Sequence, residues 1–189
     1  MFTNAYHLGF PSDSFDNVLS GFMGWYDCFD FERNEFTQPD TKAPEIHRIL
    51  REGGRFVCCS WEAQEDLAWM EAAMLRYYPN ILLDSEYLEQ RPIGMAYEKP
   101  AGYKIILEAA GFQGMEVSRE VKEFVSTDEE EWWQQMNSVG WDSLIEKIEN
   151  KNADQLQRIK QSIFSDLQPY KQPDGIHFTK RVFIVSGVK

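Results

Sequence analysis

Basic residues are scarce in this sequence, histidine and cysteine are rare, and no long apolar run occurs. Nineteen Lys and Arg face 31 Asp and Glu, which gives a formal net charge of −12. Because non-specific nucleic-acid affinity comes from clustered Lys and Arg, this balance argues against a nucleic-acid substrate. The run of about 20 apolar residues that spans a bilayer is missing, and the first residues do not have the pattern of a signal peptide. We therefore expect a cytoplasmic protein that binds neither nucleic acid nor membrane.

The three cysteines are Cys28, Cys58 and Cys59. An odd number does not suit a disulfide framework, and neighbouring cysteines in a strand point to opposite faces. The histidines do not pair with cysteine at the spacing of metal ligands. The sequence thus predicts free thiols and no metal site.

Two segments predict a strand, a helix and a second strand. Residues 15–19 form an apolar strand between a Pro-Ser-Asp turn and Ser20-Gly21. Residues 45–61 read EIHRILREGGRFVCCSW, in which an amphipathic helix ends at Gly53 and a buried strand follows over residues 55–60. A helix between two apolar strands is typical of a parallel crossover.

The rest of the chain predicts helices and two more strands. Thr127 and Glu130 have the spacing of a capping box at the start of one helix. The segment from 23 to 36 is rich in aromatic residues and predicts a loop or short helix. The other predicted elements are helices over 65–78, 100–111, 142–150 and 153–167, and strands over about 115–124 and 178–188. A length of 189 residues without repeats predicts a single domain, residues 1–189.

These segments resemble parts of class I SAM-dependent methyltransferases, in particular the ubiquinone and menaquinone type that acts on small molecules. FPSDSFDNVLSG, residues 10–21, resembles the fourth strand of that family, and EIHRILREGGRFVCCSW resembles its fifth. LEAAGF, residues 107–112, is similar to the end of the helix before the sixth strand, and residues 181–189 to the last strand. The resemblance implies an α/β class: a truncated Rossmann-like methyltransferase fold, with a mixed sheet of about four strands, helices on both faces and a helical insertion before the last strand.

The glycine-rich segment of that family has no counterpart here. Members begin with a strand, a glycine-rich turn and a helix that hold the methionine part of S-adenosyl-L-methionine (SAM). This sequence starts just before the position of the fourth strand and contains no GxGxG. The resemblance therefore implies the carboxy-terminal part of such a domain, with SAM as cofactor but weak or absent binding by this chain alone.

The strand over residues 15–19 would lose a neighbour that it has in the complete family fold. It would then become an edge, and unpaired backbone groups beside apolar side chains favour pairing with another chain. We expect a homodimer or larger assembly through this strand, unless a separate polypeptide completes the sheet.

The resemblance also assigns cofactor contacts. Asn4 and Ala5 match the pair beside the adenine ring of SAM, and Ser20, Gly21 and Phe22 follow the strand end near its methionine part. The alternatives are a disordered amino terminus for the first pair and simple turn chemistry for the other three.

Trp25, Tyr26, Trp61 and Glu62 are candidates for the wall of a small-molecule acceptor site. Aromatic walls also suit a cation–π contact with the sulfonium of SAM, whereas the alternative for the aromatic residues is core packing. Methyl transfer depends mainly on alignment of donor and acceptor, so the catalytic residues stay unknown.

Two functions follow from the sequence. The first is a SAM-dependent methyltransferase that acts on a small molecule and is impaired or inactive as this isolated chain. The second is a non-catalytic interaction or dimerisation module derived from a methyltransferase. A third reading is that the first residues are lost from a longer gene.

Overall fold

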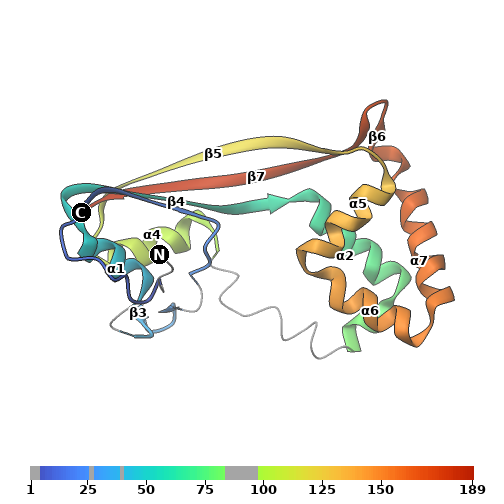
Figure 1. Ribbon diagram of the computed structural model, residues 1–189, viewed down its shortest axis with the longest axis horizontal. Coiled ribbons are helices and arrows are strands. Elements are labelled where there is room, and N and C mark those ends of the chain that lie inside the picture. Colours follow the sequence, from blue (N-terminus) through green and yellow to red (C-terminus); the bar gives the residue numbers. More distant parts are fainter. Residues whose placement is uncertain (1–4, 26–27, 39–40, 84–97) are drawn as a thin grey trace. The chain divides into compact units, whose positions relative to one another are not determined.

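The computed structural model describes residues 5–25, 28–38, 41–83 and 98–189 (Figure 1). Their contacts group the chain into two compact units. Unit 1 comprises Met1–Ala63, Pro92–Glu120 and Arg181–Lys189, and unit 2 comprises Gln64–Arg91 and Val121–Lys180. Asn4 and Tyr26, two of the predicted site residues, lie outside the described residues. The expectation of one domain over residues 1–189 stays a prediction.

The described residues form both strands and helices. The strands are β1 Phe15–Gly21, β2 Phe29–Asp30, β3 Glu35–Phe36, β4 Leu50–Gln64, β5 Gln113–Ser126, β6 Lys171–Gln172 and β7 Gly175–Val188. The α-helices are α1 Lys42–Ile49, α2 Glu65–Tyr77, α4 Pro100–Ala109, α5 Glu129–Met136, α6 Asp142–Lys151 and α7 Ala153–Asp166. Shorter helical turns are η1 Pro79–Leu83, η3 Asn137–Trp141 and η4 Gln168–Tyr170.

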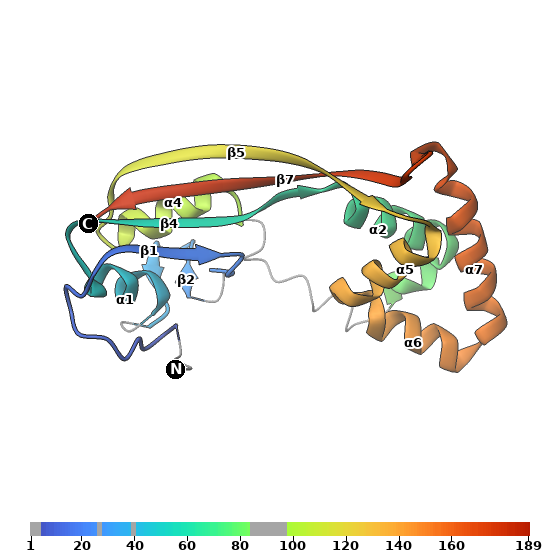
Figure 2. The same ribbon diagram turned by 45° about the horizontal axis from the view of Figure 1, so that its top comes forward.

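The main sheet has the strand order β1-β4-β7-β5, with β6 beside β7. β1 and β4 are parallel, with Val18 opposite Phe56 and Gly21 opposite Cys59. The arrows in Figure 2 show that β7 runs against β1 and β4, so the sheet is mixed, as predicted. Among the described strands β1 is the end of the sheet next to β4, which makes it an edge strand.

The core of unit 1 lies on one face of the sheet. Ile46 of α1 and Ile106 of α4 share one buried cluster with Phe56 and Phe183 of the strands, so both helices cover the same face. Because alternate residues of a strand point to opposite faces, Leu19, the neighbour of Val18, lies on the other face, where it is 78% exposed. The mixed α/β class is confirmed, but the two described helices of unit 1 do not divide between the faces as expected.

Helix α1 ends earlier than the sequence predicts. Thr41 is its N-cap residue with an extended backbone, and Pro44 stands in the first turn, where its missing N–H is harmless. The helix stops at Ile49, ahead of the predicted stop at Gly53, because Leu50 already pairs with Phe15 of β1. Gly53 has a φ of +74°, and the regular pairing of β4 with β1 resumes after it, at Arg55.

Unit 2 is mainly helical. Its buried cluster joins Met70 and Met74 of α2 with Trp132 of α5 and Ile163 of α7. Helices α5, α6 and α7 follow one another between β5 and β7, which confirms the predicted helical insertion before the last strand. Within the described parts of the chain, no helix combines the length and apolar character needed to cross a bilayer.

Candidate functional site

The parallel strands β1 and β4 bring five of the predicted site residues to one edge of unit 1. Ser20 and Gly21 end β1, Phe22 follows, and Trp61 and Glu62 stand near the end of β4. Gly21 pairs with Cys59, and the Phe22 N–H donates to the Cys59 carbonyl at 2.9 Å. Ligands of open α/β sheets bind at the carboxyl ends of parallel strands, so this edge is the candidate site.

Phe22 has the most unusual conformation at this edge. Its φ is +54°, in the left-handed region that non-glycine residues rarely occupy, and its side chain is 51% exposed. The ring stacks on Trp61, with centroids 4.6 Å apart and planes inclined by 30°. A strained backbone that presents an aromatic pair to solvent is the kind of feature found at ligand sites.

The loop after Phe22 is held from two sides. The Glu98 carboxylate accepts the Trp25 N–H at 2.7 Å and the Tyr103 hydroxyl at 2.7 Å. The Lys42 ammonium, on α1, donates to the Gly24 carbonyl at 2.7 Å. Burial, and then the hydrogen bond to Glu98, raise the pKa of Tyr103 well above its usual value, so it stays a neutral donor. These contacts hold the backbone of Gly24 and Trp25 in place.

Glu62 is neutralised by arginine side chains. Its two carboxylate oxygens accept from Arg119 Nε at 2.9 and 3.0 Å, and Arg181 lies 3.9 Å away. A carboxylate held in this way offers oriented oxygens, which suits binding of a polar group.

The remaining predicted residues differ in their surroundings. Trp25 is 1% exposed and packs edge-on against Phe56 and Tyr103, with centroids 5.9 and 6.0 Å apart, so here it is part of the core. Ala5 is half-buried in a turn that precedes β1. The roles that the resemblance gives to these two residues, and to Asn4 and Tyr26, stay predictions.

Cysteine and metal chemistry receive no support at this edge. Burial raises the pKa of the Cys58 thiol to about 12, so the reactive thiolate is not formed near neutral pH. Cys28, Cys58 and Cys59 form no disulfide. Over the described ranges, no group of three or more His, Cys, Asp and Glu side chains could hold a metal ion.

Sequence reasoning missed Glu98 and Lys42 as residues that hold the site. Glu98 precedes the helix that starts at Pro100, and Lys42 stands in the first turn of α1. Their contacts with Trp25 and Gly24 span long sequence separations, so no local pattern reveals them.

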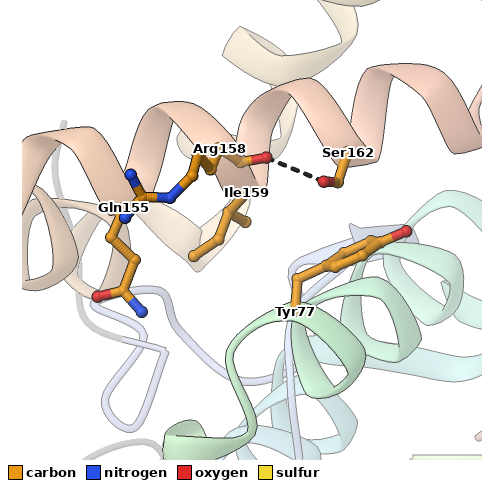
Figure 3. Close-up of a pocket in the computed structure, with 5 residues that line it drawn as sticks. All are labelled: Tyr77, Gln155, Arg158, Ile159 and Ser162. Atoms are coloured by element: carbon orange, nitrogen blue, oxygen red, sulfur yellow. Dashed lines mark hydrogen bonds between the residues drawn. The ribbon is translucent and has the colours of Figure 1, made fainter.

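Two separate hollows lie among the described residues of unit 2. One, of about 210 Å³, lies between α2 and α7, and Figure 3 shows the Tyr77 ring of α2 facing α7 residues that include Gln155 and Ser162. The other, of about 340 Å³, is lined by Trp69, Arg76 and Tyr170 among others. Neither contains a residue that the sequence predicts for cofactor or acceptor.

Comparison with known proteins identifies the fold. No family model and no curated protein matches the sequence. A solved structure of a candidate type II methyltransferase from Anaeromyxobacter dehalogenans matches with a TM-score of 0.53 and 14% identity, over 98% of this chain and 69% of that chain. The chain therefore shares its fold with a methyltransferase structure.

Other solved structures have lower structural scores. A candidate methyltransferase from Bacillus halodurans matches at a TM-score of 0.48 and 17% identity, over 99% of this chain and 69% of that chain. A SAM-dependent methyltransferase from Archaeoglobus fulgidus matches at 0.40 and 16%, over 100% and 66%. At such identities a match indicates the fold and leaves the activity of this chain to the site itself.

Proposed function

We propose that this chain is part of a SAM-dependent methyltransferase that acts on a small molecule, and that the isolated chain is impaired or inactive. The observation that carries the proposal is the exposed stack of Phe22 on Trp61. It lies at the carboxyl ends of two parallel strands in a methyltransferase fold, and Phe22 keeps a strained backbone there.

The aromatic pair suits a sulfonium. A cation over an aromatic face gains about 0.5–1 kcal/mol at exposed sites, and more when water is excluded. SAM, when bound, supplies the activated methyl group. The residues of this chain would hold the sulfonium against Phe22 and Trp61 and keep water away from the acceptor, which is most of what an in-line methyl transfer requires.

The other residues have supporting roles in the proposal. Ser20 and Gly21 offer backbone groups near the methionine part of SAM, and Asn4 and Ala5 contact the adenine ring. Glu62, oriented by Arg119, accepts a hydrogen bond from the acceptor molecule. Tyr26 stays a candidate for the acceptor wall, whereas Trp25 belongs to the core.

A non-catalytic interaction module is the second candidate function. It is favoured by the edge position of β1 and by the exposure of Leu19, since an open strand edge beside apolar side chains is a template for another chain.

Calorimetric titration of the purified chain with SAM and with S-adenosylhomocysteine tests the first function. Phe22→Ala should weaken binding by about 2- to 5-fold, because the cation–π contact that it removes is worth about 0.5–1 kcal/mol. Phe124→Ala, which truncates another exposed phenylalanine, should leave the affinity unchanged. Equal affinities for the two variants would contradict the assigned site. A flat trace for the unmodified chain, together with a dimer by light scattering, would favour the interaction module instead.

A further inference from the structure

The free edge of β1 presents backbone groups in a defined order. The Phe22 N–H points toward β4, since it donates to Cys59. Backbone groups alternate in direction along a strand, so Asn17, Leu19 and Gly21 turn their N–H and C=O groups away from β4. Among the described strands β1 pairs only with β4, which leaves those groups at an open edge.

An apolar hollow of about 300 Å³ lies beside this edge. It is lined by residues that precede β1, by β1 itself and by the end of α1: Leu8, Phe10, Phe15, Asn17, Val18 and Ile49. Two of these residues are held in place by Arg48, which donates hydrogen bonds to the carbonyls of Phe10 at 2.9 Å and Leu8 at 3.0 Å. The Glu45 carboxylate accepts the Leu8 N–H at 2.9 Å. A preformed hollow of this kind reduces the entropic cost of association.

Charges around the edge are balanced locally, although the chain carries −12 overall. Three acids near this edge each have a base: Arg51 with Asp16 at 2.7 Å, Lys189 with Asp13 at 2.8 Å, and Arg48 with Glu45 at 2.7 Å. Two copies of an acidic protein repel each other over most of their surface, and a neutral apolar patch is where they can approach.

The other edge of the sheet is protected. Strand β5 carries Glu116, Arg119, Glu120, Lys122 and Glu123 within its exposed stretch. Charged side chains along an edge are a common device against pairing with another chain. In β1 the only charged residue is Asp16, which Arg51 already neutralises.

We propose that two copies of this chain join their β1 strands antiparallel, about a two-fold axis at Leu19. Asn17 then lies opposite Gly21 of the second copy, and Leu19 opposite its equivalent, so all three outward-facing residues take part in hydrogen-bonded pairs. This register uses the whole regular part of β1, which starts at Asn17 after the register shift that follows Phe15. Asp16 comes opposite Phe22, so no like charges meet, and the exposed Leu19 side chains bury each other. The inference does not depend on the proposed methyl transfer.

Light scattering at increasing protein concentration tests the assembly. The unmodified chain should approach twice the 22.1 kDa mass of one copy. Leu19→Lys should weaken the dimer by about 100-fold or more, because the two-fold axis removes two leucine contacts at once. Val121→Lys is the matched control, an exposed apolar position of β5 that is 61% exposed, and it should leave the dimer intact. A monomer at every concentration, or a dimer that survives Leu19→Lys, would overturn the proposal.

Disulfide cross-linking tests the register independently of whether the lysine variant folds. Residues in a hydrogen-bonded antiparallel pair have Cα atoms about 5.5 Å apart, within the range that a disulfide bridges. Leu19→Cys in a Cys59→Ser background should therefore oxidise to a covalent dimer, and Val121→Cys in the same background should not. Cross-linking through residue 121 alone, or through neither residue, would show that the copies do not meet at Leu19.

Discussion

Replacement of Phe22 by glycine and by alanine separates the strain at this residue from its stacking. Both substitutions remove the ring that lies on Trp61. Only glycine also relieves the backbone, because its φ of +54° is unfavourable for any residue with a Cβ atom.

The two contributions are of similar size and can be estimated from the geometry. An aromatic pair at this separation is worth about 1 kcal/mol. The left-handed backbone costs a non-glycine residue about 1–2 kcal/mol. Glycine also lowers the free energy of unfolding by about 0.5–1 kcal/mol, because the unfolded chain becomes more flexible. Phe22→Ala should therefore lower the free energy of unfolding by about 1 kcal/mol, and Phe22→Gly should stay close to the unmodified chain.

Urea unfolding followed by tryptophan fluorescence measures the difference as a change of midpoint at constant slope. Val121 provides the control pair, since it is exposed in a regular strand where glycine is the worse residue. There the order should reverse, with Val121→Gly less stable than Val121→Ala. If Phe22→Ala equals or exceeds Phe22→Gly in stability, the backbone at this residue is not strained and the argument for a ligand site loses its basis.

Three further predictions concern unit 2. Asp66→Asn should lower the free energy of unfolding by about 3 kcal/mol, because it removes the buried carboxylate that faces the Lys180 ammonium at 2.7 Å. Urea unfolding should show most of this loss restored by Asp66→Leu combined with Lys180→Met. The hydrogen bond to Asp174 raises the pKa of His177 above its usual value of 6.5. The pair therefore stabilises the fold fully below pH 6.5, and this contribution is lost as the pH rises through the raised pKa. An NMR titration of Asp174→Asn should show the pKa of His177 fall towards 6.5. Gly175→Ala should cost at least about 2 kcal/mol in urea unfolding, since φ there is +142° and a Cβ atom would overlap the backbone of Ser126.

Local signals predicted most of the elements correctly. Helix α4 begins at Pro100 and is followed by Gly111 with a φ of +99°, as the sequence indicates. Helix α2 and strand β1 also lie where periodicity places them. Each of these depends on residues that are neighbours in the chain, so a sequence pattern is sufficient.

Element ends were predicted less well. The expected capping box of Thr127 and Glu130 is wrong by one residue. Asp128 is the N-cap and accepts the Glu131 N–H at 2.8 Å, while the Glu131 carboxylate accepts from Thr127. The segment after Met23, predicted as a loop or short helix, includes the two short strands β2 and β3. In both places several residues compete for the same backbone groups, and small differences in geometry decide between them.

The sequence alone determined most of the elements of this protein, because apolar strands, amphipathic helices and the glycine and proline at their ends depend on neighbouring residues. The mixed sheet and the helical insertion before the last strand were implied by the resemblance to methyltransferases. Tertiary structure decided what surrounds the candidate site. Residues far apart in sequence meet in the stack of Phe22 on Trp61 and in the contact of Glu98 with Trp25. The strand order of the sheet, which leaves β1 at an open edge, likewise depends on long-range pairing. Such contacts depend on how strands pair and helices pack across the whole fold, and no local pattern encodes them.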